Sequence, residues 1–316
     1  MRHLKSWILI TLCVSVSFVQ SEKLPKKLPS TFQLWEENEF TRTKIASGLV
    51  RILSYNTWGL PISLSGYDQE RRFALMGDSL SAKKADIITL QETFHPVLRE
   101  KLLSNLRNDY YTFSDYRCGR SIIPGIEMDC YGGLMTFSIF PISEEHFFPF
   151  PTNDAYSIIE KTGSKGILVS YIKHGDKLIT VINTHLYAGD NKSAEDIRLQ
   201  QINFIHDMIK TGMVKHTDRI ILVGDFNIQH PDVACSKVYD FITKNMNFMD
   251  SKPHLGKNDF TYSKTNNYCP SKTPSSKLDY VFIKSSDQGK IVSQSRIFDT
   301  KEPLSDHYGW QVNWNM

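Results

Sequence analysis

The hydrophobic positions along the chain follow two alternating patterns. Continuous apolar runs, typical of strands buried on both faces of a sheet, occur at residues 50–56, 85–92, 131–138, 167–172, 178–185, 219–223 and 278–282. Apolar residues at helical spacing predict amphipathic helices from residue 194 onward and over residues 70–85, 97–106 and 232–247. Because helices return the chain from one strand to the next, the pattern predicts β-α-β units and an α/β fold.

The strand predicted at residues 219–223 stops abruptly at Gly224. Glycine lets a backbone leave a sheet close to a neighbouring group, and the next residues place the carboxylate of Asp225 and the amide of Asn227 side by side. Asp and Asn after a strand are also ordinary turn formers. This motif taken by itself therefore leaves a structural and a functional interpretation equally open.

Other predicted strands also carry polar side chains where they start or stop. The candidates are Asn56, Glu92, His185, Asp279 and the neighbouring pair Asp306 and His307. Packed sheets can bring such ends to one rim, and catalytic residues are commonly held on loops at the ends of rigid elements. We therefore expect these side chains to converge on one site together with Asp225 and Asn227.

The residue types at these strand ends predict a cation site beside imidazoles. Carboxylate and amide oxygens suit Mg²⁺, Mn²⁺ or Ca²⁺ better than Zn²⁺. Such a cation neutralises phosphate charge and steadies a leaving oxygen, while a histidine takes the proton from an attacking water. The sequence therefore points to hydrolysis of a phosphoester.

The N-terminal residues are predicted to form a secretory signal peptide over residues 1–21. Basic residues precede an apolar stretch from Trp7 to Val19, and small residues suited to cleavage follow. An uncleaved anchor is the alternative. After cleavage we expect an exposed arm over residues 22–48 and a single catalytic domain over residues 22–316, secreted or periplasmic, because no linker separates the polar strand ends.

Composition supports a large core and a nearly neutral mature protein. Of the 316 residues, 41% are hydrophobic, which is enough to bury a sizeable core. Cleavage would remove Arg2 and Lys5, so that the formal charge falls from +3 to +1. This balance argues weakly against a dedicated nucleic-acid binder, which usually carries a broad basic surface.

Four cysteines would remain after cleavage, namely Cys118, Cys130, Cys235 and Cys269. An even number in an exported protein suggests disulfides, and three pairings are possible. Proximity in sequence favours Cys118 with Cys130 and Cys235 with Cys269. A zinc site competes with this interpretation, but no two of these cysteines have Cys-x-x-Cys spacing.

Two further stretches admit either a functional or a structural interpretation. Lys165 lies in a glycine-flanked turn before a predicted strand and could contact phosphate, although a surface lysine is the commoner explanation. Residues 147–151 are unusually aromatic. They could dip into a lipid interface or cover the edge of a strand.

Taken in order, the motifs at the strand ends resemble those of the endonuclease/exonuclease/phosphatase superfamily. They span nearly the whole mature chain and comprise Asn56, Gln91–Glu92, Asn183–His185, Gly224–Asn227, Leu278–Tyr280 and Ser305–His307. Within the superfamily the sequence is most similar to the neutral sphingomyelinases. The stretches that carry this likeness are Asn56–Pro61, Arg71–Arg72, Ser164–Gly166, Thr184–Ala188 and Pro303–His307.

The resemblance implies a four-layer α/β/β/α sandwich, in which two β-sheets pack face to face between outer helices. It also implies that Glu92 binds an essential Mg²⁺, or Mn²⁺ or Ca²⁺, helped by Asn56 and Asp306. The implied substrate is sphingomyelin or a related choline phospholipid, which would be split into ceramide and phosphocholine. We expect a monomer that touches the membrane surface transiently and does not act on nucleic acid.

Catalytic roles also follow from this resemblance, residue by residue. His307 would be the general base, oriented by Asp279. Asp225 and Asn227 would position the water and the phosphate, and His185 would stabilise the charge that builds on the phosphorus oxygens.

Two other functions compete with this expectation. One is an exported deoxyribonuclease-like endonuclease on the same scaffold, for which Arg117 and Arg120 near a predicted site loop leave room. The other is a non-catalytic binding protein that retains the fold. That alternative is disfavoured because the acids and imidazoles of the motif set are intact, among them Glu92 and His307.

Overall fold

The computed structural model describes residues 39–60, 68–112, 132–157, 160–161, 163–189, 192–228, 236–256, 259–270, 274–286 and 289–316. These belong to one compact unit, Glu37–Met316. The predicted signal peptide lies outside the described residues, as do Cys118, Cys130, Cys235, Arg117 and Arg120. Among the described helices, none is long and apolar enough to cross a membrane.

One sheet has, within the described residues, five strands in the order β10-β11-β1-β2-β3. Their bounds are β1 Leu49–Gly59, β2 Ile87–Thr93, β3 Met135–Ser138, β10 Lys290–Ile297 and β11 Gly309–Asn315. Strands β1 and β2 are parallel neighbours. Helix α2 (Gln69–Ala82) connects them, which confirms the first predicted β-α-β unit, and α3 (Pro96–Leu106) follows β2.

The other sheet has six strands over the described ranges, in the order β4-β5-β6-β7-β9-β8. Their bounds are β4 Ile142–Pro149, β5 Gly166–His174, β6 Lys177–His185, β7 Arg219–Asp225, β8 Phe248–Asp250 and β9 Asp279–Lys284. Here β6 and β7 are the parallel pair, joined by α5 (Ala194–Lys210). Each sheet thus contains one parallel β-α-β unit.

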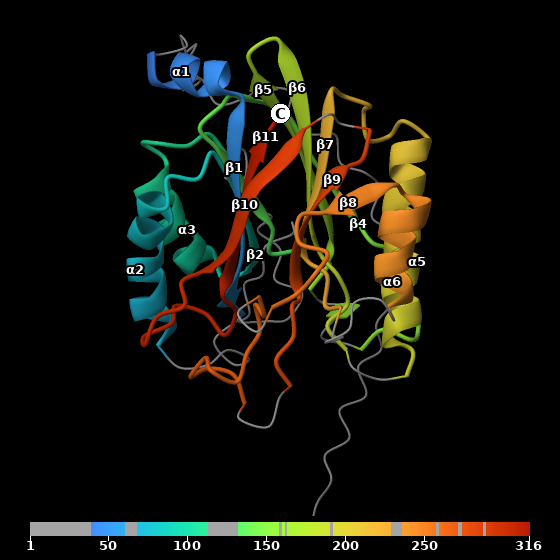
Figure 1. Ribbon diagram of the computed structural model, residues 1–316. Coiled ribbons are helices and arrows are strands. Elements are labelled where there is room, and N and C mark those ends of the chain that lie inside the picture. Colours follow the sequence, from blue (N-terminus) through green and yellow to red (C-terminus); the bar gives the residue numbers. More distant parts are fainter. Residues whose placement is uncertain are drawn as a thin grey trace, which may run out of the picture. The chain divides into compact units, whose positions relative to one another are not determined.

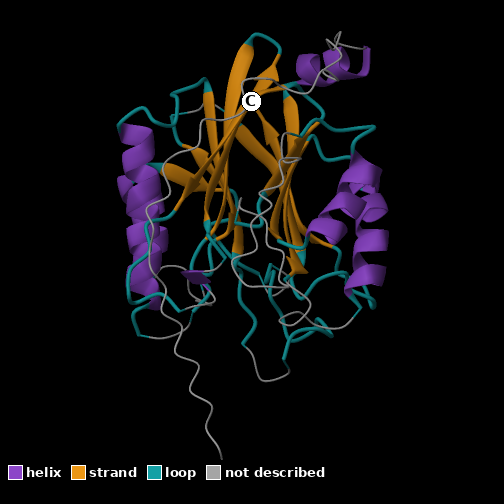
Figure 2. Ribbon diagram, turned by 180° about the vertical axis from the view of Figure 1, so that it is seen from behind, coloured by secondary structure: helices purple, strands orange, loops and turns teal. Residues whose placement is uncertain are grey.

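The two sheets pack face to face, and the long helices cover their outer faces (Figures 1 and 2). Strands β1 and β2 of the first sheet contact β7 of the second. In Figure 1, α2 and α3 flank one sheet, whereas α5 and the short α6 (Lys237–Asp240) flank the other. This arrangement confirms the predicted four-layer α/β/β/α sandwich.

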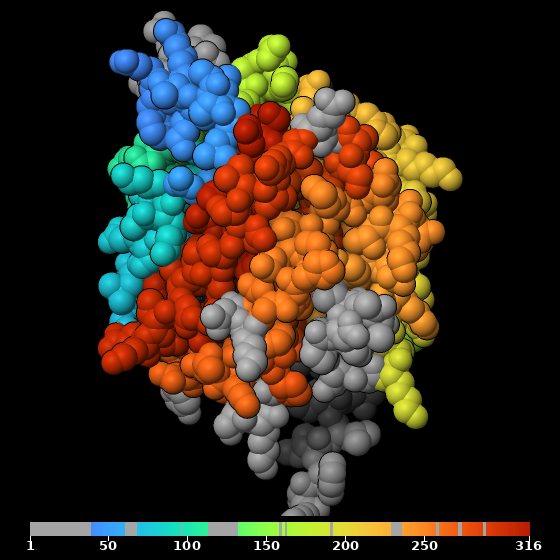
Figure 3. All heavy atoms as spheres, viewed as in Figure 1, coloured from blue at the N-terminus to red at the C-terminus, as the bar shows by residue number. Residues whose placement is uncertain are grey.

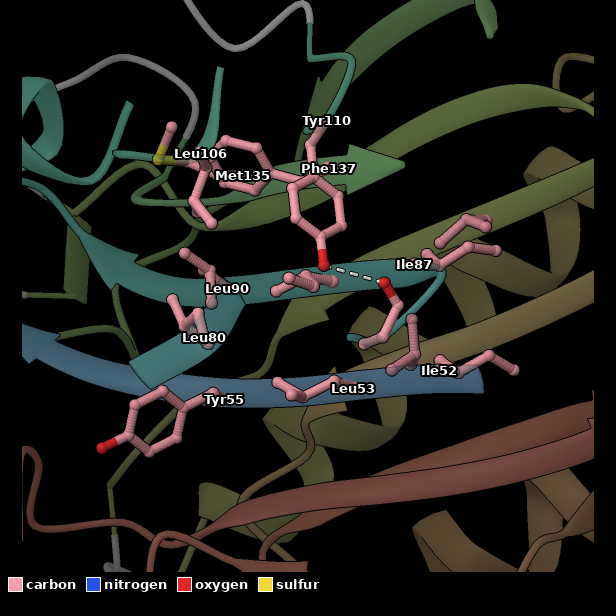
Figure 4. Packing of buried hydrophobic residues seen from close by; sticks show 14 of the residues in the cluster. Ile52, Leu53, Tyr55, Leu80, Ile87, Leu90, Leu106, Tyr110, Met135 and Phe137 are labelled. Carbon is pink, nitrogen blue, oxygen red and sulfur yellow. Dashed lines mark hydrogen bonds between the residues drawn. The ribbon is translucent and has the colours of Figure 1, made fainter. Parts of the chain in front are cut away.

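The main hydrophobic core covers both faces of the five-stranded sheet. Figure 4 shows Ile52 of β1 and Ile87 of β2 packed in the same cluster as Leu80 of α2 and Leu106 of α3. The hydroxyl of Tyr110 donates to the carbonyl of Ala85 at 2.9 Å, which gives this buried polar group a partner. Each fully buried aliphatic side chain contributes about 1.5–3 kcal/mol.

This cluster also ties the two sheets together. Val181 of β6, Val223 of β7 and Val281 of β9 face inward and belong to it. A second cluster lies between the six-stranded sheet and its helices, with Leu222 of β7 packed near Ile202 and Ile205 of α5. Strands β6, β7 and β9 are therefore buried on both faces, as their continuous apolar sequences predicted.

Several expectations about individual elements were wrong. Residues 39–47 of the predicted exposed arm form helix α1 (Glu39–Ser47). The helix predicted over residues 232–247 is shorter in the described part, because α6 passes directly into one π-helical segment, η2 (Phe241–Asn245). α6 and η2 are both short, and the apolar spacing of residues 237–245 is the same as in a regular helix. The sequence therefore did not distinguish these two segments from one longer helix.

Four strands were not predicted, namely the edge strands β4, β8 and β10 and the inner strand β11. β10 is mostly exposed, and Figure 3 shows this red strand running across the surface. In β4, charged residues interrupt the apolar pattern. The aromatic residues Phe147 and Phe148 lie on this edge strand, which agrees with the strand-edge interpretation of residues 147–151.

The expected pairing of Cys235 with Cys269 is not borne out. Cys269 is a buried free thiol in the part of the chain that the structure describes. Its Sγ donates to the carbonyl of Asp306 at 3.0 Å, and burial raises its pKa to about 12. The thiol therefore serves as a small buried donor next to a predicted site residue.

A buried ion pair stabilises the junction between β8 and the segment before β9. Lys277 Nζ lies 3.4 Å from Asp250 Oδ1, and these side chains are 0% and 1% exposed. The Lys277 ammonium also lies 4.4 Å from the ring centroid of Tyr280 and 4.6 Å from that of Trp310. Loss of either charge would leave the other buried without its counter-ion.

We predict that Asp250→Asn lowers the free energy of unfolding by about 3–5 kcal/mol, because Lys277 is then a buried unpaired cation. The matched control is Asp240→Asn, which removes the exposed i,i+4 pair with Lys244 and should cost roughly 0.5 kcal/mol or less. Urea unfolding of both variants measures the difference. Equal losses would show that burial of the Lys277 pair is energetically unimportant.

Candidate active site

The parallel strand pairs deliver four of the predicted residues. Asn56 and Glu92 lie near the ends of β1 and β2 in one sheet, whereas His185 and Asp225 end β6 and β7 in the other. Parallel neighbours end at the same edge of a sheet, so each β-α-β unit brings two side chains together there. Asp279, the first residue of antiparallel β9, pairs directly with Asp225.

The side chain of Asn56 joins the two sheets. Its Nδ2 donates to Glu92 Oε1 and to Asp225 Oδ2, both at 3.0 Å. Its Oδ1 accepts the backbone N–H of Trp58 at 3.0 Å. One lone pair of that oxygen remains for the predicted contact with a cation. In this structure, however, the main contact of Asn56 is the link between two carboxylates from different sheets.

Glu92 combines an unusual backbone with an unsatisfied carboxylate. Its φ is +58°, which is uncommon for a residue with a side chain and is typical of functional sites. Oε2 is buried and has no hydrogen-bond partner among the described residues. Burial raises the pKa of Glu92, and the hydrogen bond from Asn56 partly opposes that rise. Such an oxygen fits a hard divalent cation.

Two other acids in the site also have raised pKa values. Burial raises the pKa of Asp225 to about 6, and His307 opposes the shift. Burial raises the pKa of Asp306 to about 6 as well, and the neighbouring charge of Glu92 adds to this rise. The half-buried Asp306 accepts a 3.3 Å hydrogen bond from Ser305 Oγ. The site therefore concentrates negative charge that positive groups must balance.

His307 is held by an acid on each side of its ring. Nδ1 lies 2.9 Å from Asp279 Oδ2, and Nε2 lies 3.8 Å from Asp225 Oδ2. Burial by itself lowers the pKa of His307, but the two carboxylates outweigh burial and raise the pKa well above its ordinary value. Ligand atoms of these three residues lie within 4.8 Å of one another. The pairing with Asp279 fixes the ring orientation that a general base needs.

His185 has the opposite electrostatic setting. Burial, followed by the charge of Lys165, lowers the pKa of His185 well below its ordinary value, so the ring is neutral. Lys165 Nζ lies 3.1 Å from His185 Nε2, which places the ring proton on Nδ1. Nδ1 is buried and has no partner within the described ranges. The ring nitrogen that faces the site carboxylates is Nε2, which lies 3.6 Å from Asp225 Oδ2 and 3.9 Å from Glu92 Oε1.

Lys165 is the site residue that the sequence interpretation underrated. The expectation of a surface lysine was wrong, because its side chain is only 8% exposed. Besides His185, Nζ contacts Glu160 Oε1 at 3.1 Å and the carbonyl of Leu186 at 3.0 Å. Its glycine-flanked turn was the available signal, but only the packing of β5 against β6 shows that Lys165 points inward.

Asn227 shapes the loop after β7, whereas Gly224 lies within β7, so the strand does not stop at this glycine as the sequence predicted. The N–H of Asn227 donates to Asp225 Oδ1 at 2.9 Å, and its Nδ2 donates to the carbonyl of Leu186 at 3.1 Å. Gly224 has φ +141°, and a Cβ there would lie 1.9 Å from the carbonyl oxygen of Thr184. The close approach predicted for this glycine is therefore to the neighbouring strand.

A buried amide pair lies next to the site residues and connects the sheets. Gln91 Nε2 donates to Asn183 Oδ1 at 2.8 Å. Asn183 Nδ2 in turn donates to the carbonyls of Leu90 and Met135, both at 3.0 Å. Since Gln91 precedes Glu92 and Asn183 lies two residues before His185, these hydrogen bonds fix how the two strand ends face each other, although the buried Oε1 of Gln91 has no partner among the described residues.

All eight predicted residues lie at this one edge of the sandwich. Contacts run without a break from Glu92 through Asn56 and Asp225 to His307 and Asp279. Ser305 Oγ donates to the carbonyl of Asn56 at 2.7 Å, which brings the adjoining Asp306 to the same place. The predicted convergence is thus present, whereas the catalytic role of each residue stays a prediction.

The chain is similar to a known protein family and to named relatives. Residues 53–307 match the Endonuclease/Exonuclease/phosphatase family, and this range contains every predicted site residue. The chain is 23% identical over 281 residues to sphingomyelinase C of Bacillus cereus, with 83% of each chain covered.

Two solved structures show the same fold at low identity. Beta toxin from Staphylococcus aureus superposes with a TM-score of 0.64 at 24% identity, over 83% of this chain and 99% of that chain. TDP2 from D. rerio, complexed with single strand DNA product, superposes with a TM-score of 0.63 at 16% identity, over 85% and 99%. Both structures therefore share the sandwich fold with this chain.

We predict that Gly224→Ala destabilises the chain by about 3 kcal/mol or more, because a methyl group would meet the Thr184 carbonyl in addition to the backbone strain. Gly212→Ala is the matched control. Gly212 has φ +77° and no atom within 4 Å of an added Cβ, so only strain of roughly 1 kcal/mol is expected. Denaturant unfolding compares them, and equal effects would contradict the close approach.

Proposed function

Because the chain belongs to the Endonuclease/Exonuclease/phosphatase family, we propose that it is a secreted, metal-dependent phosphodiesterase that hydrolyses sphingomyelin to ceramide and phosphocholine. The main support is the bridge from Asn56 to the carboxylates of Glu92 and Asp225, next to the His307–Asp279 pair. The similarity to sphingomyelinase C of Bacillus cereus supports the choice of substrate.

The proposed cation ligands are Glu92 and Asp306, helped by Asn56. The buried Glu92 Oε2, without a partner among the described residues, and the raised pKa of Asp306 fit a bound divalent cation. Mg²⁺ is proposed because the ligands are hard oxygens, with Mn²⁺ or Ca²⁺ as substitutes. When bound, the cation supplies charge neutralisation for the phosphate and the leaving oxygen.

The other residues act on the water and the phosphodiester. His307 Nε2 accepts the proton of the attacking water while Asp279 holds Nδ1. This role needs the neutral ring, and the positive charge of a bound cation nearby would lower the raised pKa of His307. Asp225 and Asn227 position the water and the phosphate. His185 stabilises the charge that builds on the phosphorus oxygens.

The proposed active unit is a single domain over residues 22–316, released after removal of residues 1–21. It would act as a monomer and contact the membrane surface only transiently to reach its choline phospholipid. The small formal charge of +1 expected after cleavage is consistent with a lipid substrate. It does not suggest the strong electrostatic attraction that nucleic-acid binding uses.

A metal-dependent endonuclease is the second candidate. One observation favours it, namely the shared fold with TDP2 bound to single strand DNA product. That likeness, at 16% identity, concerns the fold and leaves the substrate open. The same catalytic groups would attack a nucleic-acid phosphodiester, so an assay must offer both substrates.

We predict that the full chain releases phosphocholine from sphingomyelin vesicles when Mg²⁺ is present. His307→Ala should lose roughly 10²–10⁴-fold of this activity, because the general base is removed. His216→Ala is the matched control, since this exposed histidine lies outside the site, and it should retain full activity.

Parallel reactions contain lysophosphatidylcholine or plasmid DNA, and the vesicle assay is repeated with Mn²⁺ and Ca²⁺. Cleavage of DNA with no lipid product would favour the endonuclease. If no phosphocholine appears with any of the three cations, the proposed sphingomyelinase activity is wrong.

A further inference from the structure

A buried arginine on α2 connects the loops that carry site residues. The side chain of Arg72 is 0% exposed. Its Nη1 donates to the carbonyl of Thr57 at 3.0 Å and to that of Leu304 at 2.8 Å. Its Nη2 donates to the carbonyl of Trp58 at 3.0 Å. One guanidinium thus holds the end of β1 against the loop that precedes β11.

The positions of these carbonyls relate Arg72 to the active site. Thr57 and Trp58 directly follow Asn56, while Leu304 lies two residues before Asp306. Trp58 has φ +52°, a strained value for a residue with a side chain, so this turn needs external support. Movement of either segment would change the distance between the amide of Asn56 and the carboxylate of Asp306 and imidazole of His307.

The surroundings of Arg72 suit a planar guanidinium. Within the described residues it forms no ion pair with a carboxylate, and burial lowers its pKa. Its carbon lies 4.7 Å from the ring centroid of Trp58 and 5.6 Å from that of Tyr268, while its edges serve the carbonyls. The carbonyl contacts of Nη1 and Nη2 offset part of the cost of burying this cation, while Nε is buried without a partner among the described residues. Lysine would present its donors from a single atom and could not stack in this way.

We propose that Arg72 is a positioning residue of the active site. It sets the placement of Asn56 relative to Asp306 and His307 through backbone carbonyls, without touching the substrate. This inference rests on the proposed phosphodiesterase function, because the geometry that Arg72 fixes is the one assigned to cation binding and proton transfer. The same geometry also governs cation affinity, which is measurable without any substrate.

Arg51 offers a matched control on the same strand. It lies near the start of β1, away from the strand end that carries Asn56. Its Nη1 donates to the carbonyls of Lys84 at 2.9 Å and Lys83 at 3.4 Å, and its Nε donates to Asn313 Oδ1 at 3.3 Å. Arg51 therefore makes the same kind of carbonyl contact where no site residue is nearby.

The experiment compares full-length Arg72→Ala, Arg72→Lys and Arg51→Ala. With sphingomyelin vesicles and saturating Mg²⁺, Arg72→Ala should lower kcat about 10²-fold, since a small misplacement of reacting groups costs that much, while KM stays unchanged. Guanidinium ion, added below the concentration that unfolds the variant, should restore part of kcat in Arg72→Ala only. Arg51→Ala should lose stability but keep the wild-type kcat.

Mg²⁺ affinity, measured by calorimetry, separates this inference from the proposed substrate. Arg72→Ala should bind Mg²⁺ roughly tenfold more weakly than Arg51→Ala, as expected when a supporting contact of a metal site is lost. This comparison decides the role of Arg72 even if the wild type cleaves no sphingomyelin. If Arg72→Ala does not fold, Arg72→Lys takes its place, with a lowered kcat and weaker Mg²⁺ binding expected. Wild-type kcat and Mg²⁺ affinity in folded Arg72 variants would overturn the proposal.

Discussion

The contact on which the site depends is the amide of Asn56 between the carboxylates of Glu92 and Asp225. These acids come from different sheets, and burial raises the pKa of each. Two buried carboxylates held this close disfavour each other's charged form. The amide donors of Asn56 and the neighbouring His307 stabilise the two carboxylates at this short separation. A divalent cation would stabilise them more strongly.

The fold supplies this contact through two β-α-β units, one in each sheet. Parallel β1 and β2 deliver Asn56 and Glu92, and parallel β6 and β7 deliver His185 and Asp225. The buried amide pair Gln91 and Asn183 fixes the sheets relative to each other beside the site. Positive φ values at Glu92 and Asn227 show that local strain is accepted where side chains must point into the site.

The sequence predicted those parts of the fold whose apolar pattern is continuous. Strands β1, β2, β6 and β7 are buried on both faces. Their continuous apolar sequences therefore predicted the strands and the polar residues at the strand ends. The edge strands β4 and β10, which carry exposed polar residues, were missed, as were the three-residue strand β8 and the inner strand β11, in which apolar and polar residues alternate. The burial of Lys165 and the free thiol of Cys269 depend on which segments pack beside them in three dimensions, which local sequence does not specify.

The most direct test of the account is Mg²⁺ binding to the full chain, followed by calorimetry. We expect binding to the wild type and an affinity weaker by tenfold or more in Glu92→Gln, because a charged oxygen ligand is replaced by an amide. Asp86→Asn, which alters a buried acid at the opposite end of β2, should bind Mg²⁺ as the wild type does. Equal affinity in all three proteins would contradict the claim that the gathered strand ends form a cation site.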